Sequence, residues 1–125
     1  FRCAACAAER SGGSHGSDTS FQPFWQALYN ANAEIVMNGH DHDYERFGPQ
    51  TATGTADAVR GLTEYIVGTG GKNLYSWGTI KANSLVRNNA TFGVVSLTLH
   101  ATGWDANFLP EAGKTFTDTS SGTCH

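Results

Sequence analysis

Basic residues and long apolar runs are both scarce in this chain. Its 125 residues include only 8 Lys and Arg against 11 Asp and Glu, which gives a formal net charge of −3. A nucleic-acid-binding domain needs a basic patch, so we expect no nucleic-acid partner. No apolar run approaches the roughly 18 residues that a membrane-spanning helix needs, so we also expect no membrane partner.

The N-terminus lacks the pattern of a signal peptide. The chain begins with Phe1 instead of Met and has neither a charged n-region nor a long apolar h-region. We therefore expect a processed or incomplete chain. A length of 125 residues suits one domain, and no internal repeat or boundary divides it. We treat residues 1–125 as a single partial domain, with residues 1–10 as an aberrant segment.

Cysteine is limited to Cys3, Cys6 and Cys124. The first two have the Cys-x-x-Cys spacing of zinc and redox motifs, but no strand precedes them, and only Cys124-His125 could complete a zinc site. We favour one disulfide from Cys124 to Cys3 or Cys6, with one thiol left over. Such a bond would suit a secreted or extracytoplasmic protein, as does the content of Gly, Ser, Thr and Asn.

Hydrophobic periodicity predicts one helix and several strands. Apolar residues at i, i+3, i+4 and i+7 predict a helix whose face packs in the core. Alternating or continuous apolar runs predict the strands, and the last two clear ones form a hairpin. The helix face consists of Phe21, Phe24, Trp25 and Leu28. The expected strands are 33–38, 62–67, 92–100 and 104–109, with a further edge strand within 113–119. We expect a polar loop at 48–61 and irregular chain at 72–91, in which Tyr75 and Trp77 are packing anchors.

Two histidines follow the apolar run Ile35-Val36-Met37, which we expect to form a buried strand. In extended backbone, residues i and i+2 point to the same side, so His40 and His42 would converge while Asp41 points away. Neutral imidazole is the commonest metal ligand, and a nearby carboxylate or carbonyl can orient its second nitrogen. Two histidines on a polar loop often have no function, and a catalytic zinc needs a third protein ligand.

Three other features carry weaker signals. The cluster Gly68-Thr69-Gly70-Gly71 lacks the third glycine of a nucleotide-binding loop, so we expect a tight turn close to the histidine loop. His15, on a Gly- and Ser-rich loop at 9–20, is either merely exposed or faces a substrate. His100, on the polar face of its strand, is expected to be exposed and not a ligand.

Residues 38–46, which read Asn-Gly-His-Asp-His-Asp-Tyr-Glu-Arg, resemble the last conserved block of the calcineurin-like metallophosphoesterases. They are most similar to the purple-acid-phosphatase-like branch, whose block reads Gly-His-x-His-x-Tyr-Glu-Arg. The segments at 15–18, 24–25, 65–71 and 113–118 also resemble that branch, so the resemblance runs from about Ser11 to the C-terminus.

The resemblance implies an α/β (α+β) fold, here the C-terminal portion of a four-layer α/β/β/α sandwich that is mostly β with one or two helices. It implies hydrolysis of a phosphate ester at a dinuclear centre of Fe, Zn or Mn. His40 and His42 would each ligate a metal, and His15 is the candidate acid for the leaving group. Where the family has a further ligand histidine, this chain has Cys6, whose thiolate is a candidate ligand.

The family's Asp-x-His, Gly-Asp and Gly-Asn-His-Glu/Asp blocks are absent and would lie upstream of Phe1. We therefore expect the missing N-terminal part of the same domain as a partner, and an inactive chain without it. A frameshift, a wrong start or a degenerate gene would equally explain residues 1–10. The alternatives are a non-catalytic β-rich binding module or degenerate remnant, and a small metal-binding protein that uses His40, His42 and the cysteines.

Overall fold

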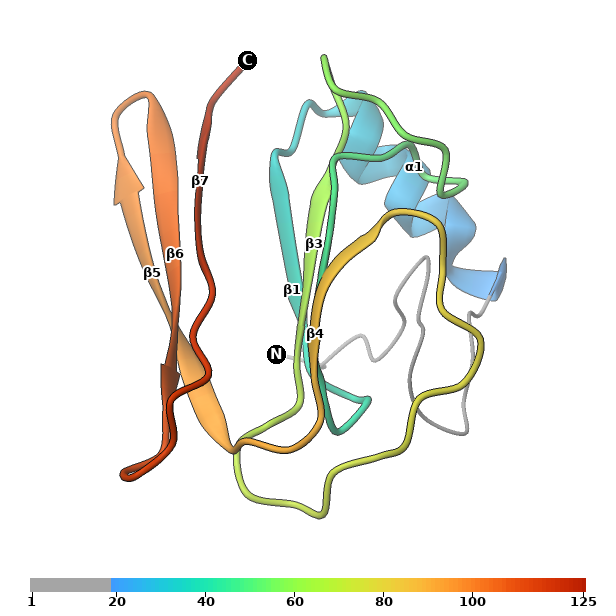
Figure 1. Cartoon of the computed structure of the whole chain (residues 1–125). Helices are drawn as coiled ribbons and strands as arrows, with labels where there is room; N and C mark the ends of the chain where they lie inside the picture. Colours follow the sequence, from blue (N-terminus) through green and yellow to red (C-terminus); the bar gives the residue numbers. More distant parts are fainter. Residues whose placement is uncertain (1–18) are drawn as a thin grey trace.

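The computed structural model of the chain describes residues 19–125, which form two β-sheets and a short α-helix (Figure 1). The first sheet has the order β1-β3-β2-β4, and β1 is parallel to β3 while β2 is antiparallel to both of its neighbours. The second sheet is antiparallel, with the order β5-β6-β7. The elements are η1 (Thr19–Phe21), α1 (Gln22–Asn30), β1 (Ile35–Asn38), β2 (Tyr44–Phe47), β3 (Thr63–Val67), β4 (Ser84–Asn88), β5 (Gly93–His100), β6 (Gly103–Pro110) and β7 (Thr119–Thr123).

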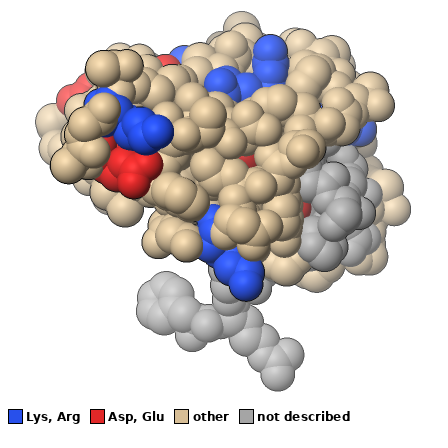
Figure 2. All heavy atoms as spheres, turned by 60° about the horizontal axis from the view of Figure 1, so that its bottom comes forward, with Lys and Arg blue, Asp and Glu red and all other residues tan. Residues whose placement is uncertain are grey.

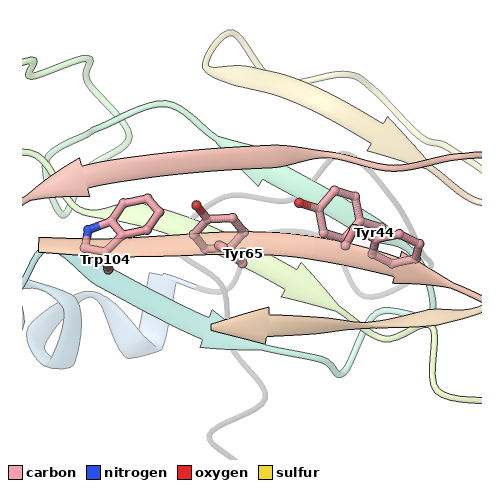
Figure 3. Packing of buried hydrophobic residues seen from close by; sticks show 5 residues of the cluster. Tyr44, Tyr65 and Trp104 are labelled. Carbon is pink, nitrogen blue, oxygen red and sulfur yellow. The ribbon is translucent and has the colours of Figure 1, made fainter. Parts of the chain in front are cut away.

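The two sheets lie face to face, and α1 covers the outer face of the first sheet (Figure 1). Aromatic side chains from both sheets fill the space between them (Figure 3). The ring of Tyr65 on β3 meets Trp104 on β6 edge to face at 5.8 Å, and Tyr44 on β2 lies 4.7 Å from Phe108 on β6. The expectation of a mostly β, α+β fold with two sheets is confirmed. The complete four-layer sandwich stays a prediction.

A second core lies beneath α1. Trp25 is buried there with Ala52 and Leu62, and Leu28 packs against them. The helix was predicted correctly, but the prediction that its whole aromatic face is core was wrong, because Phe24 is 51% exposed. The helix is only nine residues long and contacts the sheet through Trp25 and Leu28. In the described part of the chain, nothing packs over Phe24 to bury it.

Most predicted strands are confirmed, including the hairpin of β5 and β6. The prediction of a fully buried strand before His40 was wrong in its burial, since Met37 on β1 is 40% exposed. The reason is topological, because β1 is an edge strand of the described sheet. Strands β2 and β4 were not predicted. The edge strand predicted within 113–119 was wrong, because β7 spans Thr119–Thr123, where a Ser-Gly tail was expected.

Basic side chains are scattered over one face of the molecule. On the face shown in Figure 2, Lys and Arg side chains stand apart from one another and do not form one patch. None of the helices in residues 19–125 has the length and apolarity that membrane crossing requires.

Candidate metal site

The two histidines lie on the loop between β1 and β2, at the carboxyl end of β1. The backbone from His40 to Asp43 is bent, so the expected extended geometry is wrong. Burial nevertheless alternates along the loop. His40 is exposed and His42 is half-buried, whereas Asp41 and Asp43 are buried at 1% and 0% exposure. The loop thus turns its imidazoles outward and its carboxylates inward.

His42 is held by the segment that follows β3. Its Nδ1 lies 2.9 Å from the carbonyl oxygen of Asn73. Because a carbonyl can only accept a hydrogen bond, Nδ1 must carry the proton, which leaves the lone pair of a neutral ring on Nε2. The ring stacks on Tyr75 at 4.2 Å, and the Tyr75 amide donates to the His42 carbonyl at 2.9 Å. The prediction that Tyr75 is a packing anchor is confirmed.

The glycine turn at 68–71 lies against the histidine loop, as predicted. The Gly68 amide donates to the Asp43 carbonyl at 2.9 Å. A Cβ at Gly68 would lie 1.7 Å from the Asp41 carbonyl oxygen, which is far inside van der Waals contact. A Cβ at Gly39 would meet the Val67 carbonyl oxygen at 2.9 Å. The two backbones can approach this closely only because neither position has a side chain.

Buried polar side chains support the sheet behind the loop, on the face toward α1. Glu64 on β3 accepts hydrogen bonds from the Asn38 amide at 2.8 Å and from Gln50 at 3.5 Å. Glu45 on β2 accepts from the Ser84 hydroxyl. Both glutamates are fully buried. Sequence reasoning missed Glu64, although it is the one charged residue within the predicted strand 62–67, which was a usable signal.

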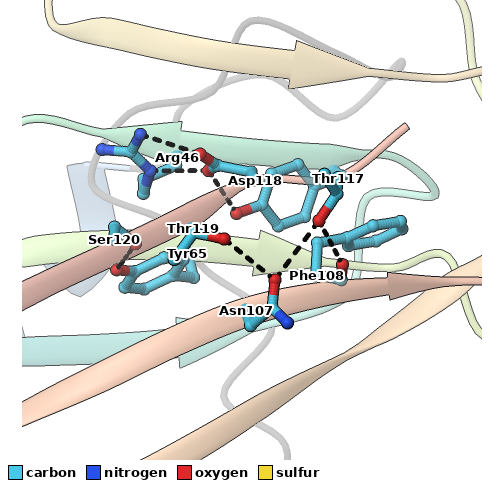
Figure 4. Close-up of polar contacts among 9 residues, drawn as sticks. Arg46, Tyr65, Asn107, Phe108, Thr117, Asp118, Thr119 and Ser120 are labelled. Atoms are coloured by element: carbon cyan, nitrogen blue, oxygen red, sulfur yellow. Dashed lines mark hydrogen bonds and ion pairs between the residues drawn. The ribbon is translucent and has the colours of Figure 1, made fainter. Parts of the chain in front are cut away.

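The end of the histidine motif contributes to a cluster between the sheets (Figure 4). Asp118, which precedes β7, accepts hydrogen bonds from Arg46 Nε at 2.7 Å and Nη2 at 3.0 Å, and from the Tyr44 hydroxyl at 2.7 Å. The Tyr65 and Ser120 hydroxyls are 2.7 Å apart. Tyr44 and Arg46 therefore serve to join the two sheets.

These contacts shift the pKa values in the cluster. Burial alone would raise the pKa of Asp118, but the hydrogen bonds from Arg46 and Tyr44 outweigh it and hold that pKa below its ordinary value. Burial, followed by the hydrogen bond to Asp118, raises the pKa of Tyr44 well above its ordinary value. The hydrogen bond to Asp118 raises the pKa of Arg46. The cluster at neutral pH is thus an ionised Asp–Arg pair with a neutral Tyr.

Of the other candidate residues, Cys124 and His100 belong to the described part of the chain. His15, Cys3 and Cys6 lie outside the described residues. Cys124 carries an exposed, free thiol, so the expected terminal disulfide is not among the described contacts. His100 is exposed, as predicted, and lies 2.6 Å from Asp105 on the neighbouring strand. A carboxylate was one group expected to orient His42, but the Asn73 carbonyl oxygen does so.

Within residues 19–125, no group of three or more His, Cys, Asp or Glu side chains could hold a metal ion. The tautomer of His42 nevertheless suits a metal ligand, because its Nδ1 donates a hydrogen bond to the Asn73 carbonyl oxygen and its Nε2 carries the lone pair. No protein-family model matches the sequence, and no curated protein matches it.

Proposed function

We propose that this chain is the C-terminal part of a metal-dependent phosphoric ester hydrolase, similar to the purple-acid-phosphatase-like metallophosphoesterases. The observation that supports this most is the state of His42, which lies in the resembling motif. A carbonyl oxygen fixes its tautomer and Tyr75 fixes its ring plane. Metal-binding histidines are commonly oriented in this way by a second group. A loop histidine without a function needs neither contact.

In this proposal His40 and His42 are ligands of a dinuclear centre, and the remaining ligands come from the missing N-terminal part of the domain. The two ions, Fe, Zn or Mn, would polarise the phosphoryl group and activate the attacking water when bound. The residues of this chain orient the imidazoles and bring the glycine turn against their loop. His15 as the acid, Cys6 as a ligand and secretion of the protein stay predictions.

Exposed apolar side chains support the idea of a partial domain. Met37 lies on the edge strand β1 and is 40% exposed, and Phe24 on α1 is 51% exposed. Leu99 on β5 is 71% exposed. An N-terminal part that adds a strand beside β1 would extend the sheet and cover Met37. Its absence would leave apolar surface open to association.

Metal titration and an activity assay on the chain 1–125 test this proposal. We expect Zn²⁺ to shift the ring-nitrogen NMR signals of His42 with Nε2 as the ligand, while Nδ1 keeps its proton. His42→Ala should weaken binding by about tenfold or more, whereas His100→Ala, at an exposed histidine elsewhere, should not. A chromogenic phosphate ester with Mn²⁺, Zn²⁺ or iron should show almost no turnover.

Two results would count against the proposal. Metal binding that is unchanged in both His40→Ala and His42→Ala would remove the metal site. Enzyme-like turnover by 1–125 that His40→Ala abolishes would show that the fragment is active alone, and would contradict the need for an N-terminal part.

A non-catalytic β-rich module is the second candidate. It is favoured by the hydrophobic cores that the described residues form, which include one between the sheets and one beneath α1. A monomer with a cooperative melt would favour the module. Dye binding and aggregation would favour the partial domain.

A further inference from the structure

The segment that orients His42 belongs to an irregular part of the chain. Between Val67 and Ser84 the described chain forms no strand or helix (Figure 1). Within this segment the Asn73 carbonyl oxygen accepts from His42 Nδ1 at 2.9 Å, and the ring of Tyr75 stacks on the imidazole at 4.2 Å. Because no ladder of hydrogen bonds fixes the segment, its position depends on individual contacts, and an anchor outside the histidine loop would hold it in place.

Asn89 provides such an anchor. Its Nδ2 donates a hydrogen bond to the Tyr75 carbonyl oxygen at 2.7 Å. A carbonyl oxygen can only accept, so the side-chain amide of Asn89 must turn its NH2 group toward Tyr75. The backbone of Tyr75 is thus held on both sides. Its N–H donates to the His42 carbonyl at 2.9 Å, and its own carbonyl accepts from Asn89.

Asn89 is itself positioned by the first sheet. It directly follows β4, whose last residue, Asn88, pairs with Tyr44 at the start of β2. The Asn88 Oδ1 accepts hydrogen bonds from the backbone amides of residues 90 and 91 at 3.1 Å and 2.9 Å. These bonds fix the turn on which Asn89 lies. Since β2 begins where the histidine loop ends, the anchor and the loop are attached to the same pair of strands.

We infer that Asn89 is a positioning residue for His42, and the relevance of this role to metal binding rests on the proposed function. Without the Asn89 donor, the Tyr75 carbonyl loses its partner, and the segment at 73–75 can move away from the imidazole. His42 then loses the acceptor of its Nδ1 proton. The neutral ring can instead carry its proton on Nε2, which removes the lone pair that a metal would use.

The first test measures the His42 tautomer in the metal-free chain 1–125, from the ring-nitrogen NMR signals at alkaline pH, where imidazole is neutral. Asn89→Asp keeps the shape of the side chain but replaces the donor with a carboxylate that repels the Tyr75 carbonyl. It should raise the ratio of the Nε2–H to the Nδ1–H tautomer by about threefold or more. Asn88→Asp adds the same charge one residue earlier and keeps the oxygen acceptor that Asn88 uses, so the ratio should not change.

Zinc titration provides the second arm. Asn89→Asp should raise the Kd for Zn²⁺ by about fivefold, whereas Asn88→Asp should not raise it. Asn89→Ala removes the donor without adding charge and should act in the same direction, and the amide spectrum of each variant reports whether the fold is retained.

An unchanged His42 tautomer ratio in both Asn89 variants would overturn the inference, even if both variants were less stable, because Asn89 would then be a purely structural residue. A shifted ratio with an unchanged Kd would overturn the link to metal binding. If the unsubstituted chain bound no Zn²⁺ through His42, the proposed function would fail, and the tautomer ratio alone would decide whether Asn89 positions the ring.

Discussion

At the residue scale, two side chains of the motif at 38–46 have different structural roles. His42 presents a lone pair on Nε2 because the Asn73 carbonyl oxygen holds its Nδ1 proton. Arg46, four residues later, forms a bidentate contact with Asp118 between the sheets. A contiguous motif therefore combines a candidate ligand with a tie between layers. Loss of activity in an Arg46 variant would not by itself identify a catalytic role.

Asp118→Asn should lower the free energy of unfolding by about 2 kcal/mol at neutral pH, because it weakens charge-assisted hydrogen bonds in a poorly hydrated site. Urea denaturation measures this. The pKa of Asp118 is depressed in the folded chain, so its contribution is complete above the ordinary carboxyl pKa of 3.8. It is lost as the pH falls from that value through the lower folded pKa.

The free energies of unfolding of Asp118→Asn and the unsubstituted chain should therefore differ at neutral pH and become equal in acid. Thr98→Val, far from the cluster on an exposed face, serves as a control with no such pH dependence. If the difference in unfolding free energy between Asp118→Asn and the unsubstituted chain stayed constant down to pH 2, the charge of the Asp118 carboxylate would not contribute to stability.

At the scale of elements, the histidine loop depends on the turn that follows β3. Gly68→Ala places a methyl group where the Asp41 carbonyl oxygen lies, so we expect a loss of at least about 2 kcal/mol in unfolding free energy. Zn²⁺-induced shifts of His42 should weaken as well. Gly70→Ala is the matched control, because a Cβ there meets nothing within 4 Å and should change stability by less than about 0.5 kcal/mol. Equal effects of the two variants would contradict this account.

Local patterns predicted the elements whose signal lies within a few residues. The alternation of Val95, Leu97 and Leu99 identified β5, and the spacing of Trp25 and Leu28 identified α1. Strand β4 was missed because its five residues mix charged, polar and apolar side chains at an edge. The exposure of Met37 could not be predicted from neighbouring residues in the sequence either, since it follows from the position of β1 at the edge of the sheet.

The candidate site was predictable only in part, for the same reason. The pair His40 and His42 is visible as a motif in the sequence. Its supporting contacts are not, because Asn73 lies 31 residues after His42 and Asp118 lies 72 residues after Arg46. Such pairings depend on the sheet topology, which no local pattern of residues contains. The turn at Gly68 was the exception, because a glycine cluster after a strand indicates close backbone approach.

At the scale of the whole molecule, the two ends of the sandwich differ in chemistry. One end carries the exposed imidazole of His40 and the glycine turn at 68–71. The other end carries a cavity of about 250 Å³ whose lining includes Glu34, Thr63 and Trp104. The core residues Tyr44 and Tyr65 lie between the two ends.

The central claim is that this chain completes a dinuclear hydrolase whose other ligands precede it. Reading the coding DNA upstream of Phe1 and across codons 1 to 14 tests this most directly. The account predicts an open frame with Asp-x-His, Gly-Asp and Gly-Asn-His-Glu/Asp blocks, and a frameshift near Cys6 would then explain the missing histidine. An in-frame stop or a clean start close to Phe1, with no such blocks, would contradict the hydrolase and leave a binding module or a remnant.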